Sequence, residues 1–275
     1  MDNTIINKKY LINYIINKGH FGQIYKGINI KNNQHIAAKL EFKNKLCTIK
    51  NEAVILKYLQ DNKCFYVPLI HWYGVFNNFY VLILPFYECN LLDIINNYSF
   101  SINKIKSYAY TMLNIIQHIH ELLIIHRDIK PEHFMISNNK LFLVDFGLST
   151  FYVDHNNQVL PNNTCTQLIG SSNYASFFLY DGNNYSKRDD LISILYVLLF
   201  MANKHLPWEK ININSNIINN NENIQIKNLK HYDNLLPIYY NIHPVFANLL
   251  SFCYQLDYYD NPNYNLYLNL CTKRE

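Results

Sequence analysis

Short apolar and aromatic runs, separated by Asn or Gly turns, fill the first third of the chain. They occupy residues 12–16, 24–30 and 79–84. Runs of this length that are rich in β-branched and aromatic residues are typical of strands. Segment 49–59 differs, because its apolar residues recur at three-residue steps, and this spacing predicts a helix. The first third of the chain therefore predicts a small, mostly antiparallel β lobe that carries one helix.

From position 91 onward the apolar spacing is helical. Ser101 is suited to cap a helix, and the apolar face that follows it consists of Ile105, Ala109, Met112, Ile116 and Ile119. The apolar segment 191–202 is shorter than the ~18 residues of a membrane span, so it predicts a buried core helix. Further helices are expected at 245–256 and 264–270. The Asn-rich stretch 211–228 predicts an exposed connection with room for a short helix. The fold class is therefore α+β.

Composition narrows the range of partners and locations. The chain has 275 residues, 49% of them hydrophobic, which is enough for a large core. Its net charge of +4 comes from 24 basic and 20 acidic side chains without a basic block, so we expect no nucleic-acid partner. The six cysteines show no paired spacing, which favours a reducing, intracellular location; we expect the cytoplasm, with the nucleus as the alternative. We also expect no secretory signal and no membrane span.

Two motifs carry side chains that are suited to phosphoryl transfer. They read HRDIKPEH at 126–133 and DFG at 145–147. Phosphoryl transfer needs little covalent chemistry from the protein and depends on positioning and charge. We predict that Asp128 orients or deprotonates the attacking hydroxyl, that Lys130 stabilises the transferring phosphoryl group, and that Asp145 binds Mg²⁺.

A turn at 17–24 is a candidate phosphate cradle. Gly19 and Gly22 would let backbone N–H groups approach phosphates closely. Asn17 occupies the place of a third glycine, and asparagine tolerates left-handed backbone better than most residues. A turn with two glycines is by itself most often a simple hairpin, so this signal gains weight only from its neighbours.

Lys39 lies one strand after that turn. Its ammonium group is predicted to reach the α- and β-phosphates of a nucleotide if Glu52, on the following helix, holds it in place. The small side chain of Ala37 leaves room for adenine. Taken alone, Lys39 is an ordinary surface lysine; its place between the glycine turn and Glu52 favours the nucleotide role.

These motifs together resemble a eukaryotic protein kinase, and four further segments resemble the casein kinase I family. The segments are 170–176 (family GTARYAS), 186–191 (family SRRDDL), 206–208 (Leu-Pro-Trp) and 257–264 (family FDDKPDY). The resemblance implies a bilobal protein kinase domain at 10–270, with a small lobe at about 10–86 and a large lobe at about 90–270. It also implies an ATP-dependent serine/threonine kinase that uses Mg²⁺, or Mn²⁺ as an alternative, acts on protein substrates and is a monomer.

The resemblance implies roles for further residues. Leu84 matches the gatekeeper, and Pro85 and Tyr87 match hinge positions whose carbonyl and N–H bind adenine. Asp190 matches a residue that braces the backbone of the catalytic loop, and Ser171 matches a threonine that contacts the catalytic Asp and Lys. The expected nucleotide-binding set is Ile16, Asn17, Gly19, Gly22, Ile24, Ala37, Lys39, Glu52, Pro85, Tyr87 and Met135.

His133 departs from the kinase pattern, which has an asparagine that contacts the second metal ion and the catalytic Asp. Mg²⁺ prefers oxygen ligands and imidazole suits softer ions such as Mn²⁺, so His133 is expected to be a poor or selective metal ligand, or else to hydrogen-bond Asp128. Loss of one preorganised contact costs about 10²–10³ in rate. The alternative to an active kinase is therefore a pseudokinase that binds nucleotide or a partner protein as a scaffold.

Substrate preference is a second departure. Asn173 replaces the Arg of GTARYAS, and Asn residues replace most of the basic run that the family carries after its Pro-Trp. We expect a weakened preference for acidic or already phosphorylated sites. A kinase for small molecules is the least favoured possibility, because segment 170–191 resembles a shelf for protein substrates.

Overall fold

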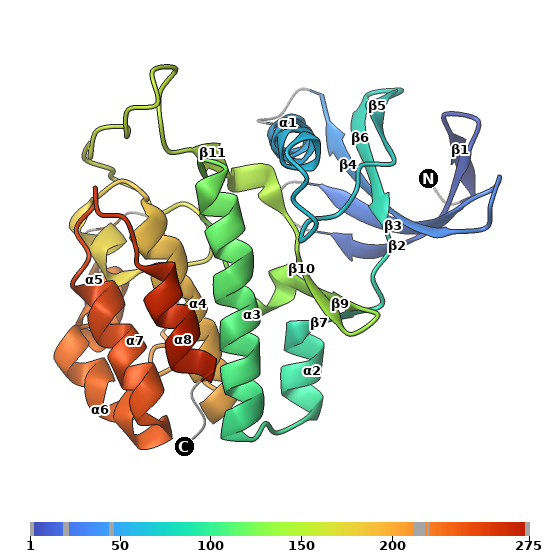
Figure 1. Ribbon diagram of the computed structural model, residues 1–275. Coiled ribbons are helices and arrows are strands. Elements are labelled where there is room, and N and C mark those ends of the chain that lie inside the picture. Colours follow the sequence, from blue (N-terminus) through green and yellow to red (C-terminus); the bar gives the residue numbers. More distant parts are fainter. Residues whose placement is uncertain (1–2, 19–21, 44–46, 212–217, 219, 273–275) are drawn as a thin grey trace. The chain divides into compact units, whose positions relative to one another are not determined.

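The computed structural model describes residues 3–18, 22–43, 47–211, 218 and 220–272. The chain divides into two compact units (Figure 1). The strand-rich unit comprises Met1–Asn90 and Phe134–Ser149, and the helix-rich unit comprises Leu91–His133 and Thr150–Glu275. The sequence predicts a change of lobe near position 90. Segment 134–149 joins the strand-rich unit because its first strand pairs with the strand that ends at Asn90.

An antiparallel six-stranded sheet, in the order β1-β2-β3-β4-β6-β5, dominates the strand-rich unit. Its strands are β1 (Thr4–Ile6), β2 (Tyr10–Lys18), β3 (Gln23–Asn29), β4 (His35–Phe42), β5 (Trp72–Phe76) and β6 (Phe79–Pro85). Alternate side chains of a strand share one face, and nine of them are buried together in one cluster, with Ile36, Ala38 and Leu40 of β4 among them. The three predicted strands are confirmed to within one or a few residues at their ends.

One helix and a smaller sheet complete the strand-rich unit. Helix α1 (Thr48–Asp61) buries Ala53, Leu56 and Leu59, the apolar residues whose spacing predicts it. The smaller sheet has the order β10-β9-β7 and consists of β7 (Cys89–Asn90), β9 (Phe134–Ser137) and β10 (Lys140–Leu143). The N–H of Leu143 donates to the carbonyl of Tyr66 at 2.9 Å, which ties this sheet to the segment after α1.

In the part that the structure describes, the helix-rich unit contains α2 to α8. They are α2 (Leu91–Asn97), α3 (Ile102–Glu121), α4 (Lys187–Asn203), α5 (Asn221–Leu229), α6 (Tyr232–Ile242), α7 (Pro244–Tyr254) and α8 (Tyr264–Thr272). The unit also contains two strands that pair with each other, β8 (Ile124–Ile125) and β11 (Thr150–Phe151). Ser101 caps α3 by accepting from the N–H of Lys104. All five apolar residues that predict α3 are buried, and the helix packs against α4 and α8 (Figure 1).

Helix α4 is buried along almost its whole length. Residues 187–201 are all buried, and from position 191 onward the helix is apolar on nearly every side, which favours full burial. At its start, the N–H of Ser186 donates to the carboxylate of Asp189 at 2.7 Å. The predicted core helix is therefore confirmed. None of the described helices is long and apolar enough to cross a membrane.

The Asn-rich stretch is less exposed than its sequence predicts. Its second half forms α5, in which Asn223 and Ile226 are fully buried, whereas residues 212–217 and 219 lie outside the described part of the chain. Only two positions of this nine-residue helix are buried, which gives too little apolar periodicity to predict a buried face. The Asn-rich sequence therefore does not indicate that the helix contacts the core. Helices α7 and α8 agree with the predicted segments to within two residues at each end.

Candidate active site

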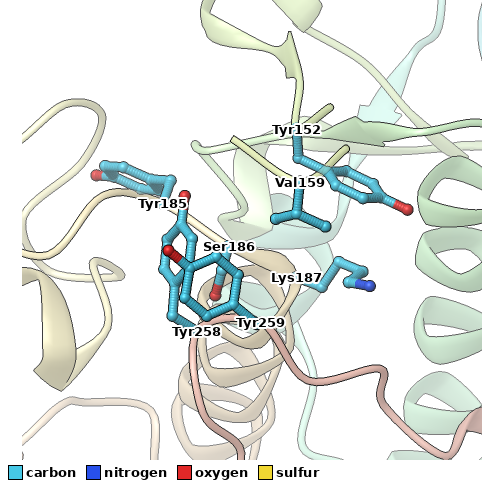
Figure 2. Close-up of a pocket in the computed structure, with 7 residues that line it drawn as sticks. All are labelled: Tyr152, Val159, Tyr185, Ser186, Lys187, Tyr258 and Tyr259. Carbon is cyan, nitrogen blue, oxygen red and sulfur yellow. The ribbon is translucent and has the colours of Figure 1, made fainter. Parts of the chain in front are cut away.

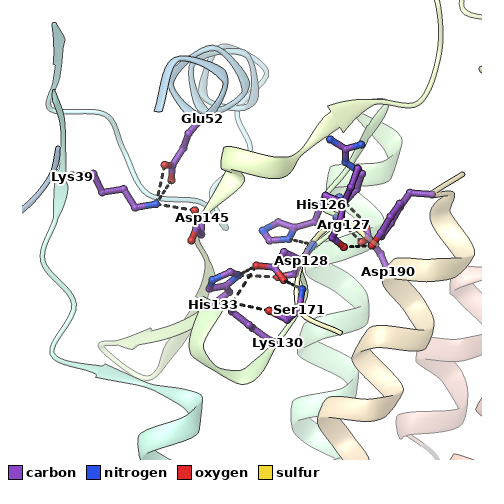
Figure 3. Close-up of polar contacts among 12 residues, drawn as sticks. Lys39, Glu52, His126, Arg127, Asp128, Lys130, His133, Asp145, Ser171 and Asp190 are labelled. Atoms are coloured by element: carbon purple, nitrogen blue, oxygen red, sulfur yellow. Dashed lines mark hydrogen bonds and ion pairs between the residues drawn. The ribbon is translucent and has the colours of Figure 1, made fainter. Parts of the chain in front are cut away.

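Lys39 is the centre of an ion-pair cluster in the strand-rich unit (Figure 3). Its Nζ donates to the two carboxylate oxygens of Glu52 at 2.8 and 3.0 Å, and to Oδ1 of Asp145 at 2.9 Å. Burial alone would lower the pKa of Lys39, but the two carboxylates outweigh burial and raise the pKa above its usual value. Lys39 is therefore a cation held in a fixed position.

Strand pairing and helix burial bring Lys39 and Glu52 together. Lys39 lies on β4, opposite Ile24 of β3 and Leu82 of β6. Glu52 lies on the buried face of α1, and only 1% of its surface is exposed. A carboxylate at such depth requires a charged partner, and Lys39 supplies it.

The segment that follows Asp145 is fixed to helix α1. The side-chain amide of Asn51 on α1 donates to the carbonyls of Gly147, at 3.0 Å, and Ser149, at 2.8 Å. Asp145 itself has a left-handed φ of 67°. This conformation is uncommon for residues other than glycine and is concentrated at functional sites. Neighbouring contacts thus hold the DFG motif in a strained turn.

The other described members of the expected nucleotide-binding set also belong to the strand-rich unit. They are Ile16 and Asn17 on β2, Gly22, Ile24 on β3, Ala37 on β4, Pro85 on β6, Tyr87, and Met135 on β9. Ala37 lies opposite Leu84 in the sheet. The ring of Tyr87 stacks on Phe142 with centroids 5.2 Å apart, and burial raises the pKa of Tyr87 to about 12.

The glycine turn is described only in part, because Gly19 lies outside the described residues. At Gly22 a Cβ atom would lie 2.3 Å from the carbonyl oxygen of Leu40. Glycine is required there by the close approach of β4, whatever else the turn binds. The structure therefore adds a packing reason for one of the two glycines that predict the cradle.

Asp128 and Lys130 lie together with Ser171 in the helix-rich unit (Figure 3). The carboxylate of Asp128 accepts from the N–H of Ser171 at 2.8 Å and lies 3.2 Å from Nζ of Lys130, which donates to Oγ of Ser171 at 2.9 Å. Burial would raise the pKa of Asp128, but His133, Lys130 and the Ser171 hydrogen bond together lower it. Asp128 is therefore an anion with a cation beside it.

His133 contacts Asp128 in this structure. Its Nδ1 lies 2.7 Å from the backbone carbonyl of Asp128 and 3.6 Å from a carboxylate oxygen of the same residue. A carbonyl oxygen only accepts, so Nδ1 carries the hydrogen. Of the two expectations for His133, this geometry matches the hydrogen bond to Asp128, and the imidazole lies in the turn Pro131–His133 with 7% of its surface exposed.

Asp190 at the start of α4 fixes the backbone of the HRD motif. Its carboxylate accepts from the N–H of His126 at 2.7 Å and of Arg127 at 2.9 Å. Burial opposes ionisation, but hydrogen bonds and nearby imidazoles lower the pKa of Asp190. Arg127 has a left-handed φ of 69°, so the bend before Asp128 is stabilised by contacts rather than by local preference.

His120 is a supporting residue that lies outside the sequence motifs. It lies on α3, its Nε2 contacts the Asp190 carboxylate at 2.9 Å, and its Nδ1 contacts the hydroxyl of Tyr264. His120 follows Ile116 by four residues, so it lies next to the apolar face of α3. A polar residue at such a position is the signal that would have pointed to it.

A small pocket elsewhere in the helix-rich unit contains none of the predicted site residues (Figure 2). It is lined by Tyr152, Val159, Tyr185, Ser186, Lys187, Tyr258 and Tyr259. Its one cation, Lys187, already donates to Asn261 and lies 4.9 Å from the ring centroid of Tyr152. We assign no ligand to this pocket.

The two predicted metal ligands belong to different units, Asp145 to the strand-rich unit and His133 to the helix-rich unit. Within the described ranges, no group of three or more His, Cys, Asp or Glu side chains is placed to hold a metal ion. The Asp145 carboxylate fits Mg²⁺ because it offers hard oxygen atoms and its side chain is 41% exposed. Mg²⁺ commonly takes one or two carboxylates and completes its shell with phosphates and water.

The motifs and the two units together define a protein kinase. The protein kinase domain model matches residues 10–269, and the chain belongs to this family. A probable serine/threonine-protein kinase of Dictyostelium discoideum is 30% identical over 270 residues, which cover 95% of this chain and 52% of that relative. The chain thus spans about half the length of the curated relative. The predicted kinase fold is confirmed.

Proposed function

We propose that the chain is an ATP-dependent serine/threonine protein kinase of casein kinase I type. The observation that carries the proposal is the position of Asp128, whose carboxylate is held by the N–H of Ser171 next to the ammonium group of Lys130. A base and a cation fixed side by side are what transfer to a hydroxyl requires. The family match and the serine/threonine kinase relative support the reaction class.

In the proposed reaction, a Ser or Thr hydroxyl of a protein substrate attacks the γ-phosphorus of ATP. The new oxygen–phosphorus bond forms while the bond to the β,γ-bridging oxygen breaks, and ADP leaves. The hydroxyl proton passes to Asp128, which its lowered pKa keeps ionised near neutral pH and ready to accept a hydrogen bond. Lys130 offsets the charge of the transferring group.

The strand-rich unit would supply the nucleotide contacts. Lys39 would hold the α- and β-phosphates, since its Nζ is already fixed by Glu52 and Asp145. Ala37 and Tyr87 would contact adenine, as the family resemblance implies. Asp145 would hold Mg²⁺, or Mn²⁺, which when bound neutralises charge on the phosphates.

The casein kinase I type rests on the four segments that resemble that family and on the absence of an Ala-Pro-Glu sequence at the end of segment 170–176. Asn173 in place of Arg predicts weak selection for primed sites. Equal rates on matched peptides with phosphoserine or serine at the priming position would support this prediction. A strong preference for the primed peptide would contradict it.

A scaffold without transfer activity is the second candidate, and His133 is the observation that favours it. The imidazole stands in place of an amide oxygen ligand and is engaged with Asp128. The retention of Lys39, Glu52, Asp128 and Asp145 argues for the enzyme, because a scaffold has no physical need of all four.

The decisive experiment measures transfer of labelled phosphate from ATP to casein with Mg²⁺ and with Mn²⁺. We expect transfer by the native chain, a loss of about 10²–10⁴-fold in Asp128→Asn, and a rise in His133→Asn that is larger with Mg²⁺. Asp233→Asn is the matched control, because that side chain is 79% exposed. No transfer by the native chain with either metal would favour the scaffold.

A further inference from the structure

Lys230 is a fully buried cation next to the segment that contains Ser171. It follows α5 directly, and 0% of its surface is exposed. Its Nζ donates to the carbonyls of Ser172, at 2.8 Å, and Ala175, at 2.6 Å, and lies 3.4 Å from the hydroxyl of Tyr180. Three aromatic rings surround it, with centroids 4.8–5.0 Å away, and they belong to Tyr180, Tyr196 and Trp208.

These surroundings are unusual for a buried ammonium group. Such a group normally has a carboxylate partner, but the described ion pairs include none for Lys230, and burial is the only cause acting on its pKa, which it lowers. Carbonyl oxygens and ring faces compensate only part of the cost of leaving water. An apolar side chain of similar length would avoid that cost, but it could not donate hydrogen bonds.

Four consecutive carbonyls beside Lys230 are held by side chains of the helix-rich unit. Lys230 and Tyr180 donate to the carbonyl of Ser172, Trp208 to that of Asn173, Ser193 to that of Tyr174, and Lys230 again to that of Ala175. Lys230 alone contacts two of the four, and these two bracket the turn. Side-chain donors therefore fix the main chain of segment 172–175, and Lys230 supplies two of the five hydrogen bonds.

This fixed segment leads directly to the candidate catalytic residues. Ser171 precedes it, donates through its N–H to Asp128 and accepts through Oγ from Lys130. The carbonyl of Ser171 also accepts from the N–H groups of Tyr174, at 2.9 Å, and Ala175, at 3.0 Å. A shift of segment 172–175 would therefore be passed to Asp128 through Ser171.

We propose that Lys230 is a positioning residue for phosphoryl transfer, which sets the place of segment 171–175 and, through Ser171, of Asp128 and Lys130. It does not touch the reacting atoms. The proposal rests on the proposed kinase function for its kinetic consequence, whereas the ordering of segment 171–175 is a property of the chain itself. Displacement of catalytic groups by about 1 Å can cost 10²-fold in rate.

The experiment compares the native chain with Lys230→Met, which keeps the length and apolar stem of the side chain but removes its donors. Lys227→Met is the matched control, because Lys227 lies one turn earlier on α5, and its partner Asp181 is 42% exposed. Three quantities are measured: kcat and KM for casein and for ATP, the melting temperature, and hydrogen exchange of the Tyr174 and Ala175 amides.

We expect Lys230→Met to lower kcat about 10- to 100-fold, with the KM for ATP changed less than about twofold and the melting temperature equal to or above that of the native chain. The two amides should exchange at least about tenfold faster. Lys227→Met should match the native chain in every measurement. Lys230→Arg, which keeps the charge and the donors, should recover part of the exchange protection.

A purely structural lysine would give a different pattern. A lower melting temperature with a fall in kcat that only matches the unfolded fraction would overturn the proposal. Unchanged kcat and unchanged exchange in a folded variant would overturn it as well. If the native chain transfers no phosphate, the kinase function fails separately. Exchange at Tyr174 and Ala175 then still decides whether Lys230 orders the segment.

Discussion

Lys39 in the strand-rich unit and Lys230 in the helix-rich unit are both removed from water, yet their surroundings are opposite. Two carboxylates hold Lys39, and its pKa is raised despite burial. Lys230 has carbonyl and aromatic partners, and burial lowers its pKa. At Lys39 charge is balanced by charge, whereas Lys230 serves as a hydrogen-bond donor to the main chain.

Because the partners differ, removing each buried lysine should have a different energetic consequence. Removing Lys39 would leave Glu52 as an unpaired carboxylate at 1% exposure, which is a large penalty. Removing Lys230 would leave the carbonyl of Ser172 with the hydroxyl of Tyr180 as its donor and would take the ammonium donor away from the carbonyl of Ala175. It would also remove the cost of burying an ammonium group. The same substitution is therefore expected to damage the two units in different ways.

Of the variants at the two lysines, Lys39→Met is expected to have the largest effect. Transfer to casein should fall about 10²–10³-fold because a preorganised cation is lost, and the free energy of unfolding should fall by about 3–5 kcal/mol because Glu52 stays buried without its partner. Urea unfolding and the transfer assay measure both. Lys57→Met on α1, the helix that carries Glu52, is the control: its side chain is 66% exposed, so stability should change by less than ~0.5 kcal/mol.

The double variant Lys39→Met/Glu52→Gln sharpens this comparison. A neutral glutamine at position 52 no longer buries an unpaired charge, so the double variant should regain about 2 kcal/mol of the stability lost in Lys39→Met. Transfer should stay as low as in Lys39→Met. If Glu52→Gln only adds to the loss, then the carboxylate is not the origin of the penalty.

At alkaline pH, the stability that each lysine contributes should change with pH in opposite directions. Burial lowers the folded-state pKa of Lys230, so below about pH 10.4 the unfolded chain binds more protons than the folded chain. The native chain should therefore gain stability relative to Lys230→Met as pH rises toward about 10.4, by at most ~1.4 kcal/mol per pH unit. The folded-state pKa of Lys39 is raised, so the difference in the free energy of unfolding between the native chain and Lys39→Met should stay constant up to about pH 10.4 and shrink above it.

Urea unfolding from pH 7 to about 11 tests this, with each variant compared to the native chain at the same pH so that shared tyrosine titration cancels. Tyr180 and Tyr196 beside Lys230 stay neutral over this range because burial raises the pKa of each. Parallel movement of the two stability differences would show that the lysines do not differ in the way described.

A smaller effect is expected at Ser171, where segment 171–175 meets the catalytic residues. Ser171→Ala keeps the N–H that binds Asp128 but removes the acceptor for Lys130. One such hydrogen bond is worth about 1 kcal/mol, so kcat should fall about fivefold with little change in the KM for ATP. Ser171→Thr keeps the hydroxyl and should be close to native; an equal loss in both variants would place the effect in the backbone.

Much of the fold and the candidate site was predictable, because local rules determine it. The three-residue steps in 49–59 and the face that begins at Ile105 predict α1 and α3, and the HRD and DFG motifs point to the residues of the two polar clusters. Lys39 and Glu52 were paired in the prediction by the spacing of a strand and a helix, and the structure brings them to 2.8 Å.

Other features could not be predicted, since they depend on distant contacts. Lys230 follows a stretch rich in Asn, where a lysine is expected to be exposed, and only packing against Trp208 and Tyr196 buries it. The sequence left two roles open for His133, and the turn of 131–133 decides between them by placing its Nδ1 at the backbone carbonyl of Asp128. The return of 134–149 to the strand-rich unit depends on pairing with β7, a strand of two residues.

The hydrogen bonds to the carbonyls of segment 172–175 have an evolutionary consequence. Lys230, Trp208 and Ser193 hold carbonyl groups, which every amino acid carries, rather than the side chains of Ser172 and Asn173. Substitutions at those two positions can therefore change the surface offered to a substrate without cutting the contacts that shape the loop. A lineage could drift in target choice, or an engineer could exchange Asn173 for Arg, while the catalytic apparatus is inherited intact.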